Sequence, residues 1–262
     1  MSTSWGETAT PSPDYFDIVV IDPGHGGHDH GARGERGLVE KDLVLDISLR
    51  AAEQLRRRGV TVLLTREEDR FVDLEERTQL ANRAKADLFV SVHANSSSFR
   101  NARGPETFFA SLEATDEAAR ELASRENLAL GAEATPNVPG FDPVAAILGK
   151  LADNESLRES QEFAKIVQTR FSSLHDLRSR GVKQAPFVVL MNVEMPAALL
   201  ELGFVTNARE AEEFGNEEYR DELAGALVEA VVRFGARRDA RRGLTKPGTS
   251  KATGKVAADE GS

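Results

Sequence analysis

Short apolar runs alternate along the 262-residue chain with segments of helical periodicity, and this alternation constrains the fold more than any other feature. Runs rich in β-branched residues are typical of strands, and strands separated by helical segments favour a parallel sheet covered by helices. Six runs are strand candidates: DIVVI (17–21), VTVLLT (60–65), DLFVSVHA (87–94), ETFFA (106–110), PFVVL (186–190) and AALLEL (197–202). The sequence therefore predicts a single α/β domain with a mixed, largely parallel sheet flanked by helices on both faces.

The segments between these runs carry helix signals. Over 41–58, apolar residues recur every four positions and form one stripe that a core can cover. Asp73 followed three residues later by Glu76 is a helix start signal, and we expect this helix to end near Lys85. Further helices are predicted over 113–130, 154–177 and 216–234.

Composition changes towards both ends of the chain. We expect a flexible segment over 1–15, a folded domain over 16–235 and a disordered tail over 236–262, where large apolar residues almost vanish. The tail holds seven basic and three acidic residues, which indicates a solvated end or, as the alternative, a contact with an anionic polymer. The whole chain has a formal charge of −10 and lacks the basic stripe of nucleic-acid binding, so no nucleic-acid partner is expected.

The chain contains no cysteine, which excludes disulfides, thiolate metal sites and a cysteine nucleophile. No run approaches 18 consecutive apolar residues, so we expect no transmembrane segment. The first residues lack the basic start and apolar centre of a secretory signal. We therefore expect either an intracellular protein or one whose export signal lay upstream.

Residues 21–34, IDPGHGGHDHGARG, place three histidines and five glycines directly after the first strand candidate. His25 follows that strand, and His93 lies at the end of another. Because the carboxyl ends of parallel strands line the ligand crevice of such sheets, these two imidazoles can share a metal ion. Glu40 opens the first long helix, where the chain can fold back beside His25. A His, Glu, His set with an open fourth position is typical of catalytic zinc.

Each of these residues also has a structural interpretation. His25 can be a solvated or hydrogen-bonded residue of a turn, His93 a packed strand end, and Glu40 a charge favoured by the helix dipole. His28 and His30 lie two positions apart on the glycine-rich turn, and we expect them to be exposed rather than ligating.

Glu201 is the one carboxylate in the otherwise apolar run AALLELGF. Burying a charge is costly unless the charge finds a partner. That partner can be an arginine such as Arg66 or Arg77, in a structural ion pair, or the water on a zinc ion.

Six blocks of the sequence resemble, in order, the zinc-dependent N-acetylmuramoyl-L-alanine amidases, which cut bacterial peptidoglycan. The blocks are VVIDPGHGGHDHGARG, EKDLVLDIS, VLLTREEDRFVDLEERTQLAN, ADLFVSVHAN, SRGVKQAPFVVL and PAALLELGFVTN. The resemblance covers about residues 16–235 and makes that range the catalytic domain. It implies one Zn²⁺ per chain, held by His25, Glu40 and His93, with Glu201 as the catalytic glutamate.

The same resemblance implies that the substrate is peptidoglycan, cleaved at the amide bond between N-acetylmuramic acid and L-alanine. It places the protein in the periplasm or cell envelope, and we expect a monomer. His30 stands where the family usually has a proline, which makes a second metal contact conceivable. The alternatives are a zinc peptidase of other specificity and a non-catalytic cell-wall binding module. Such a module would be expected to have lost a ligand or Glu201, and none is missing.

Residues 122–153 interrupt the order of the blocks. They resemble the insertion of family members that act in cell separation, where an inserted helix covers the active site until an activator protein displaces it. We expect Glu126, or else Glu133, to contact the zinc in a resting state. The alternative is an ordinary surface excursion with a core-packed helix. An apolar helical face is expected to receive the activator: Val144, Ile147, Leu148 and Leu151.

Overall fold

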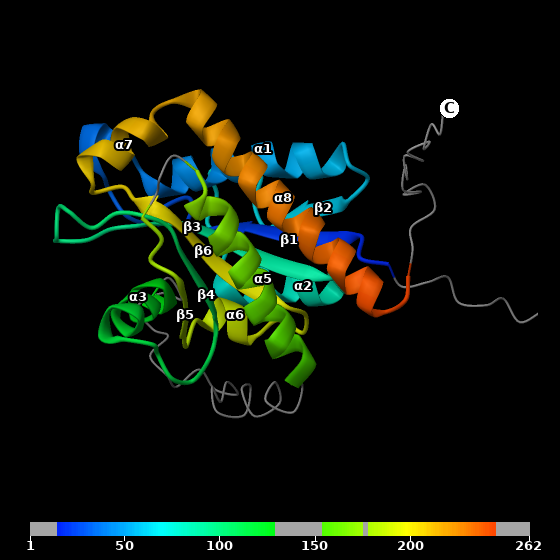
Figure 1. Ribbon diagram of the computed structural model, residues 1–262. Helices are drawn as coiled ribbons and strands as arrows, with labels where there is room; N and C mark the ends of the chain where they lie inside the picture. Colours follow the sequence, from blue (N-terminus) through cyan, green and yellow to red (C-terminus); the bar gives the residue numbers. More distant parts are fainter. Residues whose placement is uncertain (1–14, 129–153, 175–177, 245–262) are drawn as a thin grey trace, which may run out of the picture.

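The computed structural model describes residues 15–128, 154–174 and 178–244. Six strands form one sheet in the order β2-β1-β3-β6-β4-β5 (Figure 1). Every neighbouring pair is parallel except β4 and β6, which are antiparallel. The expected mixed, largely parallel sheet is therefore confirmed. The strands are β1 (Ile18–Pro23), β2 (Thr61–Leu64), β3 (Leu88–Asn95), β4 (Glu106–Ala110), β5 (Val182–Ala185) and β6 (Ala197–Phe204).

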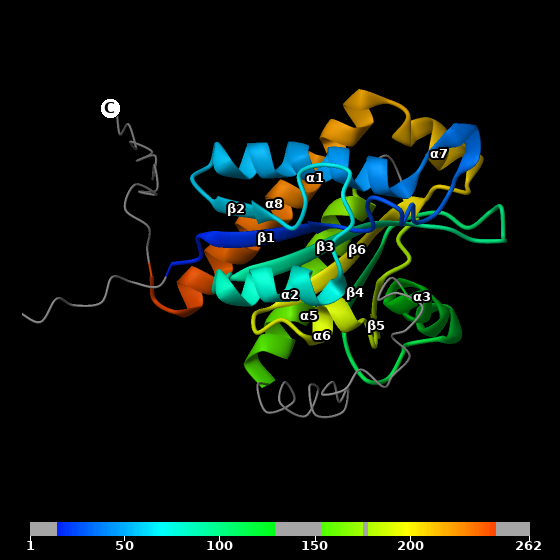
Figure 2. The same ribbon diagram turned by 180° about the vertical axis from the view of Figure 1, so that it is seen from behind.

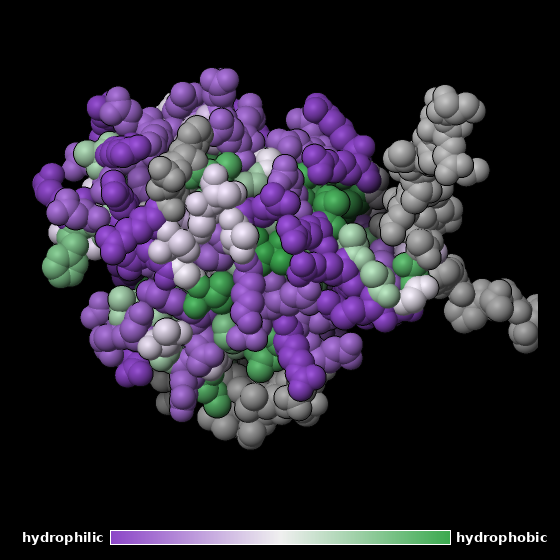
Figure 3. Space-filling model, in the orientation of Figure 1, coloured by the Kyte–Doolittle hydropathy of each residue, from purple (hydrophilic) through white to green (hydrophobic). Residues whose placement is uncertain are grey.

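Helices cover both faces of this sheet, as expected, because alternate strand residues point to opposite sides (Figures 1 and 2). One core packs α1, α5 and α8 against the sheet, and the other packs α2, α3 and α6. The outer surface over α5 and α8 is mostly hydrophilic (Figure 3). The helices are η1 (Glu35–Gly37), α1 (Glu40–Arg56), α2 (Leu74–Arg83), α3 (Glu117–Asn127), α5 (Asn154–Ser172), α6 (Val188–Met191), α7 (Ala208–Phe214) and α8 (Glu217–Arg241).

The predicted start of α2 is confirmed. The Asp73 side chain accepts a hydrogen bond of 2.7 Å from the Glu76 backbone N–H, which satisfies a donor that the first helical turn leaves free. Within the described residues, no helix has the length and apolar character needed to span a bilayer.

The strand prediction for PFVVL (186–190) is wrong. The strand in this region is the more polar β5, which lies at the edge of the sheet and pairs with β4. Phe187 instead caps the short helix α6, and its carbonyl accepts hydrogen bonds from Leu190 and Met191. The apolar run is buried on the face of the sheet rather than within it, so its hydrophobicity signals burial but not a strand.

The predicted tail boundary at residue 236 is also wrong, because α8 continues to Arg241. Buried polar contacts hold its last turns. Arg238 forms an ion pair with Asp87, and the Asp239 carboxylate accepts a hydrogen bond of 2.8 Å from the Phe16 backbone N–H. These partners lie far away in the sequence, so local composition does not reveal them. The loss of apolar residues after 235 therefore predicted the end of the domain too early. Residues 1–14 and 245–262 lie outside the described residues.

Candidate active site

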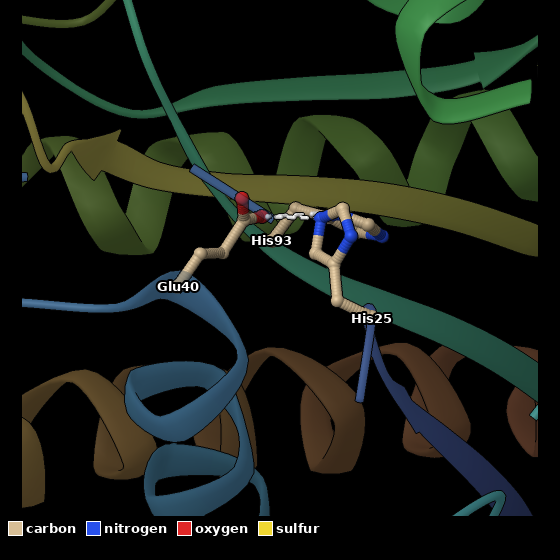
Figure 4. A group of neighbouring side chains, drawn as sticks. All are labelled: His25, Glu40 and His93. Atoms are coloured by element: carbon tan, nitrogen blue, oxygen red, sulfur yellow. Dashed lines mark hydrogen bonds and ion pairs between the residues drawn. The ribbon is translucent and has the colours of Figure 1, made fainter. Parts of the chain in front are cut away.

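The structure brings His25, Glu40 and His93 together at the carboxyl ends of β1 and β3 (Figure 4). Glu40 Oε1 lies 3.1 Å from His25 Nε2 and 3.1 Å from His93 Nδ1. One potential ligand atom from each residue lies within 4.8 Å of those of the other two. All three are buried, so a small cation would find a compact set of donors shielded from bulk water.

Strand order and two glycines produce this convergence. β1 and β3 are parallel neighbours with Pro23 opposite Val92, so the chain leaves both strands at the same edge of the sheet. A Cβ atom at Gly24 would collide with the ring of His93. Gly31 has a φ of +62°, and a Cβ there would lie 2.6 Å from Glu40 Oε2. Only glycine leaves room for the ligands at these two positions.

Two buried arginines hold the glycine-rich turn in place. Arg66 donates to the Gly24 carbonyl at 2.7 Å, and Arg77 donates to the His25 carbonyl at 2.8 Å. Arg77 also forms a buried ion pair of 2.7 Å with Asp22. Both arginines thus bind the glycine-rich turn, β1 and the start of α1. Neither forms an ion pair with Glu201, which was one of the two partners that the sequence suggested for that carboxylate.

Asp29 is a site residue that the sequence analysis missed. Its carboxylate lies 2.8 Å from His25 Nδ1, which directs His25 Nε2 towards Glu40 and His93. A carboxylate in this place fixes the ring orientation and tautomer of a ligating histidine. Its position four residues after His25 in the same turn was the sequence signal that could have identified it.

His28, by contrast, is exposed and packs against Phe71 with ring centroids 4.3 Å apart.

Hydrogen bonds and neighbouring histidines keep the buried Glu40 carboxylate ionised. Its Oε1 accepts a hydrogen bond of 2.9 Å from Ala94 N, and its Oε2 accepts one of 2.7 Å from Ala32 N. Burial opposes the charge, but the attraction and hydrogen bonds of His25 and His93 outweigh it and lower the pKa of Glu40. His25 Nε2 is buried, and its neighbours are the carboxylate oxygens of Glu40 at 3.1 Å and Glu126 at 3.4 Å. An imidazole nitrogen directed at an ionised carboxylate fits a metal ligand set.

Glu201 lies on β6 directly opposite His93 on β3 and is 1% exposed. Its Oε2 has no hydrogen-bond partner among the described residues. Burial, reinforced by repulsion from Glu40 and Glu126, raises the pKa of Glu201 well above its ordinary value. A carboxylate with these properties binds and releases a proton readily, as a general base and acid must.

The family profile described as N-acetylmuramoyl-L-alanine amidase matches residues 19–233. The chain belongs to this family. The group of His25, Glu40 and His93 and the neighbouring Glu201 all lie within the matched range of this chain.

Named relatives agree with this assignment. The N-acetylmuramoyl-L-alanine amidase AmiA of Escherichia coli is 34% identical over 218 residues, which cover 83% of this chain and 75% of AmiA. AmiC of Neisseria meningitidis is 34% identical over 220 residues, which cover 83% of this chain and 52% of AmiC. The solved amidase AmiC2 of Nostoc punctiforme is 30% identical with a TM-score of 0.62, over 83% of this chain and 96% of that one. The chain is therefore a peptidoglycan amidase by family, sequence and fold.

In this amidase the last turn of α3 reaches the cluster of His25, Glu40 and His93. Glu126 Oε2 lies 3.2 Å from His93 Nδ1 and 3.4 Å from His25 Nε2. Potential ligand atoms of Glu126, His93 and Glu201 also lie within 4.8 Å of one another. The cavity beside the two histidines has a volume of only about 20 Å³, and Glu126 forms part of its lining. Burial raises the pKa of Glu126 despite the attraction of His93.

The residues on either side of Glu126 fasten α3 to the domain. Arg125 donates a hydrogen bond of 3.1 Å to the side chain of Asn95 at the end of β3. Asn127 donates to the Pro186 carbonyl and accepts from the Val188 N–H, both at 2.9 Å. Glu133 and the apolar face over 144–151 lie outside the described residues.

Proposed function

We propose that this amidase holds one zinc ion on His25, Glu40 and His93 and cleaves the amide bond between N-acetylmuramic acid and L-alanine. The observation that carries the proposal is the convergence of three buried side chains whose potential ligand atoms lie within 4.8 Å of one another, with Glu40 Oε1 3.1 Å from a ring nitrogen of each histidine. Three protein ligands are what catalytic zinc sites use, because the fourth position serves water or substrate.

A zinc ion held by His25, Glu40 and His93 would supply Lewis-acid chemistry, which polarises a carbonyl and lowers the pKa of water from 15.7 towards about 7. Glu201 accepts the proton of the attacking water, because it is buried beside His93 and has a raised pKa. Glu201 then returns this proton to the leaving nitrogen of L-alanine. The products are a glycan strand and a free stem peptide. Asp29 keeps His25 oriented throughout.

The experiment is a zinc titration of metal-stripped protein, read by the digestion of purified peptidoglycan sacculi. We expect activity to rise with zinc and to level off at one equivalent per chain. Simple peptides without muramic acid, assayed in parallel, test the alternative of a zinc peptidase. If the peptides are cleaved rapidly while the sacculi stay undigested, the proposed substrate is contradicted. If the protein binds sacculi and cleaves neither substrate, a wall-binding module is favoured.

We also propose that Glu126 holds the enzyme in a resting state. Its carboxylate lies within hydrogen-bonding distance of one ligand histidine and close to the other, and it narrows the adjacent cavity. A zinc ion on the two histidines and Glu40 would also attract the Glu126 carboxylate, which in that place would exclude the substrate carbonyl. An activator protein that draws residues 122–153 away would restore activity. Because peptidoglycan is the proposed substrate, we place the protein in the cell envelope. The resemblance of residues 122–153 to the insertion of family members that act in cell separation supports the same role here.

Replacing residues 124–150 with a short glycine-serine linker tests this resting state. We expect the folded, zinc-loaded deletion variant to digest sacculi much faster than the parent without any partner. A variant of equal zinc content that is no faster than the parent would defeat the proposal.

A further inference from the structure

A cationic cavity of about 320 Å³ lies between the chain that precedes β4 and the start of β5. No carboxylate appears among its described lining residues, although the whole chain carries a net charge of −10. This concentration of positive charge on an acidic protein calls for an explanation. The described lining consists of Asn101, Arg103, Arg178, Ser179, Arg180 and Lys183.

The backbone brings these residues together. Gly104 has a φ of +96°, and a Cβ atom there would collide with the Arg178 carbonyl oxygen. The Arg180 N–H donates a hydrogen bond of 3.1 Å to the Pro105 carbonyl. The segments 101–105 and 178–181 therefore run against each other, and this close approach requires the glycine. Side chains from both segments therefore line the same cavity.

Nearby carboxylates compensate only part of this charge. Lys183 lies 3.4 Å from Glu106 and 3.1 Å from Asp116, and Arg180 forms an ion pair with Glu106 through its Nε. Arg103 and Arg178 form no ion pair or side-chain hydrogen bond among the described residues, and both are exposed.

Another carboxylate near these arginines is Glu210. It is buried, and it accepts hydrogen bonds of 2.8 Å from the Gly104 and Phe204 N–H groups. Its oxygens are thus directed to the backbone. Arg103 and Arg178 retain donors for an anionic ligand.

Arg180 connects this cavity to the reaction centre. It also lines a second cavity of about 470 Å³, together with Glu106, Asn95 and Arg125. Glu106 on β4 lies directly opposite Glu201 on β6, which in turn lies opposite His93 on β3.

Neighbouring strands are about 4.8 Å apart, so Glu106 lies roughly 10 Å from His93 across the sheet. An extended peptide covers that distance in about three residues. A peptide that leaves the metal centre along this path comes to Glu106 with about its third residue, and the long side chain of Arg180, which contacts Glu106, reaches back towards the second.

We propose that this cationic cavity is a subsite for the stem peptide and that Arg103, Arg178 and Arg180 bind the free carboxylate of its second residue. The proposal rests on the proposed function, because it takes the peptide beyond the scissile bond as the ligand. It makes the subsite a determinant of specificity: a stem whose second residue carries a carboxamide loses a charge-assisted hydrogen bond.

Two measurements test the subsite separately from catalysis. The first is the affinity of the complete protein for the free tripeptide L-alanyl-γ-D-glutamyl-L-lysine, compared with the same tripeptide amidated at the glutamyl α-carboxyl group. The second is kcat/KM for the two corresponding muramyl tripeptides. We expect the carboxylate form to be favoured about tenfold in both measurements, through Kd and KM rather than kcat. We expect this preference to shrink as salt screens the charges.

The test variant is Arg103→Ala/Arg178→Ala, and the matched control is Arg58→Ala/Arg233→Ala, which removes two exposed arginines that line neither cavity. We expect the test variant to lose the preference for the carboxylate form and the control to keep it. Equal affinity of the wild type for both tripeptides, or a preference that survives in the test variant, would overturn the subsite. If the wild type binds the tripeptides selectively but neither it nor the Glu126→Gln variant cleaves either muramyl peptide, the proposed function fails and the subsite stands.

Discussion

The carboxylate of Glu126 lies 3.2 Å from Nδ1 of His93, and the Glu126 side chain is only 14% exposed. This contact joins the last turn of α3 to the centre of the sheet. It puts an acidic group beside His25 and His93, where the proposed zinc would bind.

We predict that Glu126→Gln increases the digestion of sacculi about tenfold, because a neutral amide binds zinc more weakly than a carboxylate and so releases the fourth position. Zinc content, measured by atomic emission, should stay at one per chain. Glu117→Gln removes an exposed carboxylate from the first turn of the same helix and serves as the control. Equal rates for Glu126→Gln, Glu117→Gln and the wild type would refute the resting-state contact.

We predict that His93→Ala loses bound zinc and activity together, since it removes one of only three proposed protein ligands. His25→Ala and Glu40→Ala should behave alike. His28→Ala is the matched control, because His28 is exposed and packs on Phe71 instead. Near-stoichiometric zinc in dialysed His93→Ala protein would show that the metal lies elsewhere.

Glu201→Gln should keep its zinc and lose turnover by about 10²- to 10⁴-fold, the usual contribution of a general base or acid. The substitution preserves shape and removes an ionisable group whose charged form burial disfavours, so folding should not suffer. Sacculus digestion and zinc content, measured on one preparation, check both statements. An ordinary rate in this variant would assign the base to another residue.

Arg238→Ala should lower the free energy of unfolding by about 3 kcal/mol, because it leaves the buried Asp87 carboxylate without its cationic partner. Urea denaturation measures this loss. Arg237→Ala is the control on the neighbouring position, where the side chain is 47% exposed, and it should change stability by less than about 0.5 kcal/mol. Similar midpoints for the two variants would contradict a structural role for the end of α8.

The sequence predicted what depends on local pattern and on the ends of strands. His25 and His93 were placed near one another because parallel strands end at a common edge, and the structure brings them together. The strand at PFVVL and the tail at residue 236 were wrong, because burial on a sheet face and long-range ion pairs leave no periodic signal. The cluster of Arg103 and Arg178 was missed for the same reason: it exists only after two distant segments meet.

Three consecutive residues at the end of α3 each contact a different part of the domain: Arg125 contacts β3, Glu126 the two histidines, and Asn127 the chain around Pro186. Because the three residues are consecutive, a movement of the turn away from the domain that breaks one contact strains the other two, and we expect the three contacts to break together. If each contact contributes about 1 kcal/mol, the closed arrangement outweighs the open one by roughly 100-fold. Under the proposed resting state, about one molecule in a hundred would be open at any time, so the enzyme without an activator would keep roughly 1% of its full activity.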